Sequence, residues 1–452
     1  MTVLSPSSRV HIMGVAGAGM SALAVYLAEW GAAVSGCDER PGPVLDQLAH
    51  RGVRVREGHD ASHLENVDVL LWSPAVREDH PELLAGRASG CRLLSRRELL
   101  ADLARTRSVL AVTGTHGKTT ATSMLAHVLA AAGDASWIVG AEVRDLGYAG
   151  HFGSGPLALE LDESYGTFTE ISPAGLAVLN VDVDHLDYYG DLDSLRRAFA
   201  EVMERTSGPV VIYEPDVGAT TAAALARREI VRVGPSRSGA DFELDLLEHR
   251  PFAIRGLLRS GGDEVELNLR VGGEHNLVDA ALVAALARSV GVSSEAVSEG
   301  VGAFRGAPRR FERVGEYRGA DVVIDYAHLP AEIAATLRGA RESGYRDPVV
   351  VFQPHRYTRT LEVGDDFAPA FDDLDLLVVT DIYGAGETNP TGVTGEFLVE
   401  ALLRRGRVGR VLYARDLAEA AAQLEGLFCG DLLLLVGAGD VPTLATLLGV
   451  SA

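Results

Sequence analysis

The stretch Ser108-Val-Leu-Ala-Val-Thr-Gly-Thr-His-Gly-Lys-Thr-Thr120 decides the fold class of this part of the chain. Residues 108–113 form an apolar run that predicts a buried parallel strand, and residues 120–132 carry apolar side chains at helical spacing. Between them lies a loop with two glycines, whose backbone N–H groups can turn toward an anion at the N-terminus of the helix. The order of strand, loop and helix therefore predicts an α/β fold with a phosphate-binding loop for ATP or GTP.

Lys118 is the only lysine in 452 residues, and the other positively charged side chains are arginines. A compact ammonium group fits inside a loop of backbone N–H groups better than a guanidinium does. We expect Lys118 to reach the β- and γ-phosphates and the Thr119 hydroxyl to bind Mg²⁺. Val112 stands where a standard P-loop has its first glycine, so only the second half of that motif matches. The alternative is a glycine-rich turn with an exposed lysine.

The composition of the chain limits which kinds of partner this protein is expected to bind. A formal net charge of -22 argues against nucleic acid or an anionic membrane as a partner. No signal peptide is visible, and the longest apolar run, residues 432–436, is too short to cross a bilayer, so a cytoplasmic protein is expected. Cys37, Cys91 and Cys429 lack metal-ligand spacing and are predicted to be reduced packing residues.

Residues 1–106 alternate strand and helix patterns in the manner of a Rossmann-like domain. A strand over 9–13 leads into a glycine-rich turn over 14–21, a helix over 22–30 and a second strand that ends near Asp38. The glycine spacing differs from the dinucleotide fingerprint, so the turn predicts a diphosphate bound at a helix N-terminus. Two alternatives are a tight turn without a ligand and an NAD-dependent oxidoreductase.

Residues 107–307 form the second segment, in which acidic side chains follow two predicted strands. The first of these strands ends in Glu160-Leu-Asp162-Glu163, and the second leads into Asn180-Val-Asp-Val-Asp-His-Leu-Asp187. The ends of parallel strands share one edge of a sheet, so carboxylates and His185 should lie near the phosphate loop. They would suit Mg²⁺ or Mn²⁺, although a lone histidine is more often structural.

The rest of this segment contains a stretch over 234–271, which predicts a β-rich decoration of the domain, and a helix over 277–290. Asn276 precedes the helix, where it would either cap the helix or face a nucleotide base. Residues 308–452 predict a second α/β domain. Its strands end in polar and cationic groups, including Asp325-Tyr-Ala-His328 and Gln353-Pro-His-Arg-Tyr-Thr-Arg-Thr360. A solvated charged face is the alternative for these groups.

Together these motifs resemble the Mur ligase family over nearly the whole chain. The resemblance rests on the following segments in the family's order: Gly114–Thr120, Asn180–Asp187, Glu274–Asn276, Arg310–Glu312 and Asp325–His328. Gly14–Ser21 and Phe352–Thr360 are similar to the branch of the family that adds L-alanine to UDP-N-acetylmuramate. Several sister ligases resemble one another in carrying a carbamoylated lysine after the Asp-His motif. Residues 186–204 of this chain contain no lysine, which fits the alanine-adding branch.

The resemblance implies an α/β protein of three-domain Mur ligase architecture, with boundaries at 1–106, 107–307 and 308–452. It implies an enzyme that uses ATP and Mg²⁺, with Mn²⁺ as a substitute, to join L-alanine to UDP-N-acetylmuramate through an acyl phosphate, in peptidoglycan precursor synthesis. We expect a monomer or weak homodimer.

The resemblance also implies residue roles. ATP would be bound by Gly114, Thr115, His116, Gly117, Lys118, Thr119, Thr120, Asn276, Arg310 and Asp325. The UDP-sugar would be bound by Gly14, Gly17, Ala18, Gly19, Met20, Ser21, Asp38 and Ser73. The metal would be held by Thr119, Glu160 and His185. Catalysis would involve Lys118, His185, His355, Arg356 and Arg359.

Two positions depart from that branch of the family. Tyr165 stands where the branch usually has Asp, and Leu329 stands where it usually has a second His. These departures leave open a divergent ligase that joins a different amino acid or a peptide to a UDP-sugar acid. A protein that binds these ligands without catalysis is a further alternative, against which the intact Lys118, Glu160 and His185 argue.

Overall fold

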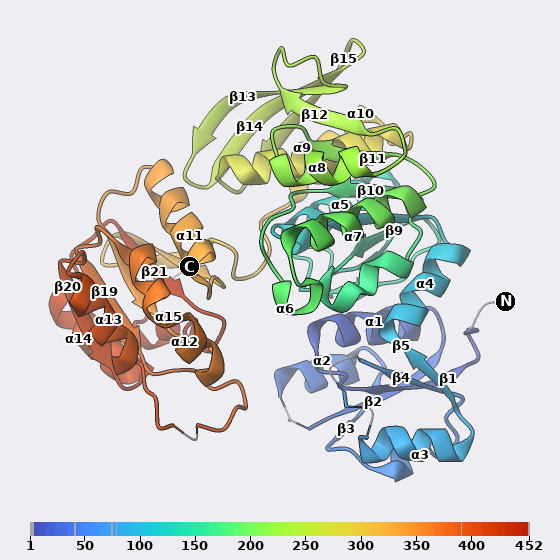
Figure 1. Cartoon of the computed structure of the whole chain (residues 1–452), viewed down its shortest axis with the longest axis horizontal. Coiled ribbons are helices and arrows are strands. Elements are labelled where there is room, and N and C mark those ends of the chain that lie inside the picture. The colour runs from blue at the N-terminus through green and yellow to red at the C-terminus, as the bar shows by residue number, and fades with distance from the viewer. Residues whose placement is uncertain (1–3, 40–41, 74–75, 78, 390, 451–452) are drawn as a thin grey trace. The chain divides into compact units, whose positions relative to one another are not determined.

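The computed structural model describes residues 4–39, 42–73, 76–77, 79–389 and 391–450, and the side chains of Tyr165, Thr167 and Asp187 lie outside the described part. The chain divides into two compact units, Met1–His249 with Ala253–Ala307 and Arg250–Phe252 with Pro308–Ala452. The first unit holds two sheets and the second holds one (Figure 1).

The N-terminal sheet is parallel, with the strand order β3-β2-β1-β4-β5. Its strands are β1 (Arg9–Met13), β2 (Ala33–Asp38), β3 (Arg54–Glu57), β4 (Val69–Trp72) and β5 (Arg92–Ser95). Its helices are α1 (Ala18–Glu29), α2 (Pro43–His50), η1 (Ala61–Leu64), α3 (Pro81–Ser89) and α4 (Arg96–Thr106). On β1, Val10 and Ile12 face α1, whereas Met13 packs with Leu64 and Leu83 on the other face. This alternation gives the sheet two buried faces.

The central sheet has the order β15-β14-β13-β12-β11-β10-β6-β9-β7-β8. Its strands are β6 (Val109–Thr113), β7 (Ser136–Ile138), β8 (Gly150–His151), β9 (Leu157–Glu160), β10 (Gly175–Val178), β11 (Val210–Tyr213), β12 (Val231–Pro235), β13 (Phe242–Arg250), β14 (Ala253–Ser260) and β15 (Asp263–Leu269). Its helices are α5 (Lys118–Ala132), η2 (Ser164–Glu170), α6 (Leu186–Tyr189), α7 (Leu192–Arg205), α8 (Val217–Leu225), α9 (Glu274–Ser289) and α10 (Ser294–Ala303).

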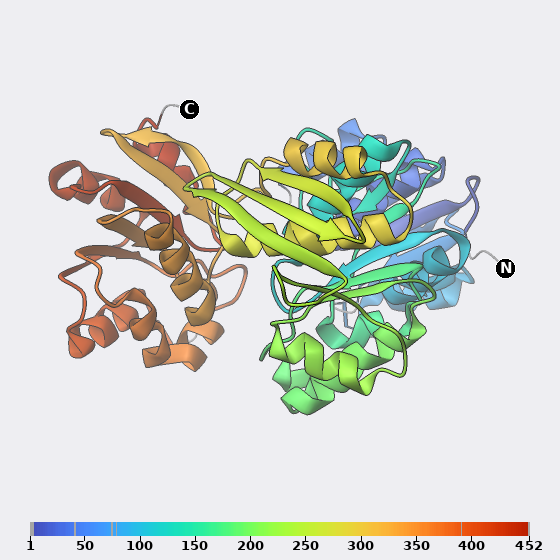
Figure 2. The same cartoon turned by 90° about the horizontal axis from the view of Figure 1, so that it is seen from above.

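The central sheet is covered on both faces (Figures 1 and 2). On β6, Leu110 and Val112 join the core formed with α5, α9 and α10, whereas Val109 and Ala111 join the core formed with α7 and α8. The latter core continues into the N-terminal domain through α1. The Arg107 guanidinium also donates to the Tyr26 hydroxyl at 3.0 Å. These contacts explain why the first two domains form one unit.

The second unit has a six-stranded sheet in the order β16-β17-β21-β18-β19-β20. Its strands are β16 (Glu312–Tyr317), β17 (Ala320–Asp325), β18 (Pro348–Phe352), β19 (Leu376–Thr380), β20 (Arg410–Ala414) and β21 (Leu432–Val436). Its helices are α11 (Pro330–Glu342), α12 (Tyr357–Val363), η3 (Gly364–Phe371), α13 (Glu396–Arg405), α14 (Leu417–Leu427) and α15 (Thr443–Leu447). The continuous apolar run of β21 is buried on both faces, as expected for a central strand.

The α/β fold class is confirmed, with two differences in detail. The glycine-rich turns are shorter than expected, because α1 begins at Ala18 and α5 at Lys118. The β-rich stretch continues the central sheet as β12–β15 rather than forming a separate decoration. Among the described residues, the structure contains no helix long and apolar enough to cross a membrane.

Candidate active site

The phosphate loop joins β6 to α5 and is held in place by Asn180, which follows β10. Asn180 accepts from the Thr115 amide through its carbonyl (3.1 Å) and from the His116 amide through Oδ1 (2.8 Å), and its Nδ2 donates to the His116 carbonyl (3.0 Å). Gly114 has φ +147°, and a Cβ there would lie 3.1 Å from the Asn180 backbone. The loop therefore requires glycine at this position. Its shape is set by Asn180, which lies 64 residues after His116 in the sequence.

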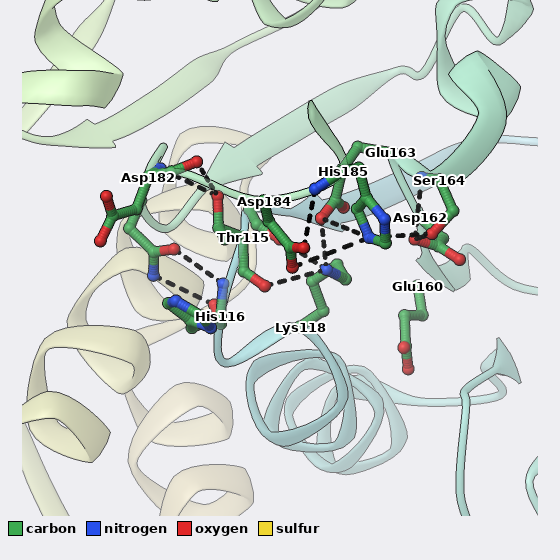
Figure 3. A network of polar contacts seen from close by, with 12 residues as sticks. Thr115, His116, Lys118, Glu160, Asp162, Glu163, Ser164, Asp182, Asp184 and His185 are labelled. Atoms are coloured by element: carbon green, nitrogen blue, oxygen red, sulfur yellow. Dashed lines mark hydrogen bonds and ion pairs between the residues drawn. The ribbon is translucent and has the colours of Figure 1, made fainter. Parts of the chain in front are cut away.

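The Lys118 ammonium group is held by three oxygens (Figure 3). It donates to the carbonyls of Gly114 (2.8 Å) and Thr115 (3.1 Å) and to Glu163 Oε1 (2.9 Å). Glu163 is fully buried, and burial raises its pKa although Lys118 opposes the shift. The ammonium group is thus fixed over the loop, where the phosphates of a nucleotide would replace the carboxylate as its partner.

His185 lies beside an acidic pair that follows β9. Its Nε2 is 3.2 Å from Ser164 Oγ, 3.9 Å from Glu163 Oε1 and 3.7 Å from Asp184 Oδ2. Ser164 in turn donates to Asp162 Oδ1 through its hydroxyl at 2.8 Å. Burial opposes ionisation of Asp162, but Lys118 and the hydrogen bonds from Ser164 outweigh it and hold the pKa of Asp162 below its usual value.

The residues of this acidic group fit a divalent cation. Asp162, Glu163 and His185 each offer a ligand atom, and these atoms lie within 4.8 Å of one another. Glu163 Oε2 is buried and makes no hydrogen bond in the described structure, so one carboxylate oxygen remains to be satisfied. Carboxylate oxygens with one imidazole suit Mg²⁺ or Mn²⁺.

The predicted metal set of Thr119, Glu160 and His185 is divided between two places. The Thr119 hydroxyl donates to Glu160 Oε1 (3.0 Å), and the Gly140 amide donates to Glu160 Oε2 (2.6 Å). Burial raises the pKa of Glu160. His185 instead belongs to the group with Asp162 and Glu163, two residues that the predicted set omitted.

Asp279 on α9 is a buried acid that lies against the loop. A Cβ on Gly117 (φ +84°) would lie 2.7 Å from Asp279 Oδ2, so glycine leaves the space that this carboxyl occupies. Burial raises the pKa of Asp279 well above its usual value. Burial therefore favours the protonated form of this carboxyl, next to the place where phosphates would bind.

The N-terminal turn presents the beginning of α1 in a similar way. The amides of Gly14 and Val15 donate to the Cys37 carbonyl, and the Ala16 amide donates to Asp38 Oδ2 (3.0 Å). Asp38 therefore shapes the turn. Ser73 follows β4, which neighbours β1, so it lies at the same edge of the sheet.

The amides at the beginning of α1 have two different roles. Those of Met20 and Ser21 donate to the Gly17 carbonyl, the Ser21 hydroxyl donates to the Ala18 carbonyl, and both side chains are buried. The amides of Ala18 and Gly19 instead point outward from the helix, as the geometry of a helix N-terminus requires.

Arg96, the first residue of α4, reaches the same place. A Cβ on Gly19 would lie 2.8 Å from its guanidinium carbon, and its Nε is buried without a hydrogen bond in the described structure. A guanidinium beside a helix N-terminus suits a diphosphate. The sequence motifs did not single out this arginine, because it lies far from the turn along the chain.

A cationic cluster follows β18 in the second unit. His355 Nδ1 lies 3.2 Å from an Arg359 nitrogen, and its ring stacks on Tyr383 at 5.8 Å. Arg356 has φ +69°, and its amide donates to the Tyr383 carbonyl at 2.8 Å. Burial, aided by His328 and the two arginines, lowers the pKa of His355 to about 4, so its imidazole is neutral at pH 7.

Three further predicted residues have contacts within the protein. Both Asp325 oxygens accept backbone amides, those of Phe311 and Ala327 at 2.8 Å, and burial raises its pKa. The Arg310 guanidinium lies 5.3 Å from the Tyr326 ring. The capping alternative for Asn276 is wrong: Gly273 is the N-cap of α9, and Asn276 Nδ2 donates to the Gly272 carbonyl at 2.6 Å.

These features define an α/β protein that binds a nucleoside triphosphate. They are a glycine loop between a strand and a helix, and a lysine beside carboxylates at the ends of parallel strands. Comparison with known proteins is more specific. The family models that match are "Mur ligase family, catalytic domain" (residues 9–108), "Mur ligase middle domain" (112–287) and "Mur ligase, glutamate ligase domain" (309–439).

The relatives agree with these family models. The chain is 44% identical to the UDP-N-acetylmuramate–L-alanine ligase of Kineococcus radiotolerans over 96% of this chain and 94% of that one. It is 40% identical to the ligase of the same name from Anaeromyxobacter sp., over 97% and 96% of the two chains. The crystal structure of UDP-N-acetylmuramate–alanine ligase from Thermotoga maritima matches over 98% of both chains, with a TM-score of 0.81 and 29% identity. The chain belongs to the Mur ligase family.

Proposed function

We propose that this chain joins L-alanine to the lactyl carboxylate of UDP-N-acetylmuramate with cleavage of ATP to ADP and phosphate, a step of peptidoglycan precursor synthesis. The observation that carries the proposal is Lys118, held between the loop carbonyls and Glu163 beside the acidic group of Asp162 and His185. Full-length similarity to ligases of that name supports the choice of substrates.

The chemistry requires an activated carboxylate, because a free carboxylate is a poor electrophile. Transfer of the γ-phosphoryl group to it gives an acyl phosphate and ADP. The amine then attacks the acyl carbon, and phosphate leaves from a tetrahedral intermediate. Negative charge develops in both steps, so fixed positive groups such as Lys118 stabilise them.

For ATP, residues 114–120 hold the phosphates, with Lys118 on the β- and γ-phosphates. Asn276, Arg310 and Asp325 remain predicted nucleotide contacts. Mg²⁺, with Mn²⁺ as a substitute, would be held by Asp162, Glu163 and His185, with Thr119 and Glu160 as the other candidates. The ion would supply charge neutralisation for the phosphates.

For the UDP-sugar, we assign the diphosphate to the amides of Ala18 and Gly19 and to the Arg96 guanidinium. Arg356 and Arg359 supply positive charge for the amino acid and the acyl phosphate, and the neutral imidazole of His355 lies beside Arg359. Leu329 is the N-cap of α11, where its amide donates to Glu332 Oε2 at 3.1 Å, and it offers no titratable group to the amine. The side chain of Tyr165, the other departure, lies outside the described residues.

Further parts of the proposal concern the whole molecule. The domain boundaries are 1–106, 107–307 and 308–452. The protein works in the cytoplasm as a monomer or weak homodimer, on small molecules rather than nucleic acid or membranes. Its negative charge supports this last point.

The test is ADP release by purified protein with ATP, UDP-N-acetylmuramate and a panel of amines: L-alanine, glycine, L-serine and a tripeptide. We expect release to require the UDP-sugar, with kcat/KM at least about tenfold higher for L-alanine than for the other amines. A clear preference for the tripeptide would instead identify a peptide-joining ligase. No ADP release with any amine would overturn the proposal.

A further inference from the structure

Four potential metal ligands from distant parts of the sequence meet inside the N-terminal domain. They are His11 on β1, Cys37 on β2, His63 in η1 and Glu82 on α3, and each offers one ligand atom within 4.8 Å of the others. Parallel pairing of β1 with β2 brings the first two onto the same face of the sheet. The other two lie in the segments that cover this face.

The distances between the ligand atoms match those of a tetrahedral site. His11 Nε2 lies 3.3 Å from Cys37 Sγ and 3.2 Å from Glu82 Oε1. Cys37 Sγ is 3.4 Å from Glu82 Oε1, and His63 Nδ1 is 3.3 Å from the same oxygen. Ligands bound to Zn²⁺ at its usual bond lengths form a tetrahedron with edges of about 3.3–3.7 Å.

One atom in this group makes no hydrogen bond. His63 Nδ1 is buried and makes no hydrogen bond in the described structure, and its side chain is only 7% exposed. The nitrogen lies 3.3 Å from Glu82 Oε1, whose side chain is fully buried. A buried imidazole nitrogen without a hydrogen bond is unfavourable, and a metal ion would satisfy it.

Surrounding residues orient two of the ligands. His11 Nδ1 lies 2.9 Å from Ser35 Oγ, and the Ser35 hydroxyl donates to the Val10 carbonyl at 3.4 Å. The serine oxygen therefore accepts from Nδ1–H, which leaves the lone pair of Nε2 directed at the group. His59 Nδ1 holds the other oxygen of Glu82 at 2.6 Å. Such outer contacts are typical of metal ligands.

We infer that His11, Cys37, His63 and Glu82 form a closed, four-coordinate site for a zinc-class divalent ion. A thiolate, a carboxylate and two neutral imidazoles carry two negative charges, which a divalent ion neutralises, as a buried site requires. Two soft or borderline ligand types, sulfur and imidazole, favour Zn²⁺ or Co²⁺ over Mg²⁺. The site is separate from the acidic group near Lys118, which contains no sulfur.

The position of the site indicates its effect. The Cys37 carbonyl accepts from the amides of Gly14 (2.9 Å) and Val15 (3.1 Å) in the turn before α1. A metal ion on Cys37 would fix the base of this turn and join α3 and η1 to the sheet. The site is thus structural, because four protein ligands leave no coordination position for a substrate.

The experiment is a Co²⁺ titration of the tag-free full chain, followed by absorption spectroscopy and displacement with Zn²⁺. We expect one equivalent of Co²⁺ to give intense visible bands of a tetrahedral ion and a near-ultraviolet thiolate-to-cobalt band. Zn²⁺ should displace it and raise Tm, since a ligand that binds only the folded state stabilises it. Co²⁺ at the Lys118 site would give no thiolate band, so failure here is distinguishable from failure of the proposed ligase activity.

Two variants and a matched control complete the test. Cys37→Ser should abolish the thiolate band, and His63→Ala should weaken Co²⁺ binding by at least about 100-fold. Cys91→Ser is the control, because Cys91 is a free cysteine outside the group, and it should leave the spectrum unchanged. Absence of the thiolate band in the unmodified protein, or its loss in Cys91→Ser but not in Cys37→Ser, would overturn the site.

Discussion

The first unit contains the same device twice, and the two copies differ in their surroundings. In both, a parallel strand leads through a glycine turn into a helix: β1 to α1 across Gly14–Gly17, and β6 to α5 across Gly114–Gly117. The second turn has its own lysine, Lys118, and an acidic group within reach of it. The first turn has no lysine and receives Arg96 from another helix.

In both turns the backbone provides an anion site, and the side chains around it select the anion. An ammonium group among carboxylates suits a triphosphate that arrives with a divalent ion, because the carboxylates hold the metal. A single guanidinium beside a helix start suits a diphosphate without a metal. We therefore assign ATP to the second turn and the UDP-sugar to the first.

The largest effect is expected from Lys118→Ala. Loss of the ammonium group should reduce kcat/KM by roughly 1,000-fold, about 4 kcal/mol, because it acts where charge develops during phosphoryl transfer. The measurement is ADP release under steady-state conditions. Lys118→Arg serves as the control for charge and should recover little activity, since a guanidinium does not fit the space between the loop carbonyls. Activity within about fivefold of the unmodified protein in Lys118→Ala would exclude the assigned role.

A smaller and more selective effect is expected from Arg96→Ala. We expect KM for UDP-N-acetylmuramate to rise by roughly 10–100-fold, because one charge-assisted contact to a diphosphate is lost. KM for ATP should stay unchanged within a factor of about three. Initial rates over a grid of both substrate concentrations give the two constants. Arg97→Ala is the neighbouring control, because Arg97 pairs with Glu170 rather than approaching Gly19. An equal rise in the KM values for UDP-N-acetylmuramate and ATP would contradict the assignment of a different ligand to each turn.

His185→Ala should alter the requirement for metal. We expect about tenfold more Mg²⁺ for half-maximal activity, because one of three ligands is lost, while the affinity for the UDP-sugar stays the same. Activity measured as a function of Mg²⁺ concentration gives the metal requirement, and a binding titration gives the affinity for the UDP-sugar. If both quantities weaken alike, His185 does not act through the metal.

The smallest effect is expected from Asp279→Asn. Burial raises the pKa of Asp279, so the folded state binds more protons than the unfolded state and stability falls as pH rises above the usual carboxyl value. Asparagine removes this penalty, so Tm at pH 8 should rise by on the order of 2 °C, and the gain should shrink as pH falls toward about 4. Turnover should change less than about threefold. A constant gain at every pH would show that titration of Asp279 is not its cause.

Local patterns predicted most of the architecture. The run at 108–113 and the helix after Lys118 were found because buried parallel strands and helices have distinct apolar periods. The strand-end groups near Glu160 and His185 were predicted because parallel strands bring their carboxyl ends to one edge. The capping alternative for Asn276 was wrong because the N-cap of α9 is Gly273, with φ +92°, three residues earlier.

Contacts between distant residues could not be predicted in this way. Arg96 reaches Gly19 only because α4 returns to the beginning of α1. Cys37 was expected to be a simple packing residue, since no second ligand lies near it in the sequence, yet strand pairing and α3 bring His11 and Glu82 to its sulfur. Glu163 was not singled out as the partner of Lys118 for the same reason.

Calorimetric titration tests most directly whether each turn binds a different anion. Two single variants are titrated with a non-hydrolysable ATP analogue with Mg²⁺ and with UDP-N-acetylmuramate. We expect Lys118→Ala to lose binding of the ATP analogue but keep binding of the UDP-sugar, and Arg96→Ala to show the reverse. If both variants lose the same ligand, or if Lys118→Ala binds the ATP analogue as tightly as the unmodified protein, the assignment of one anion to each turn is contradicted.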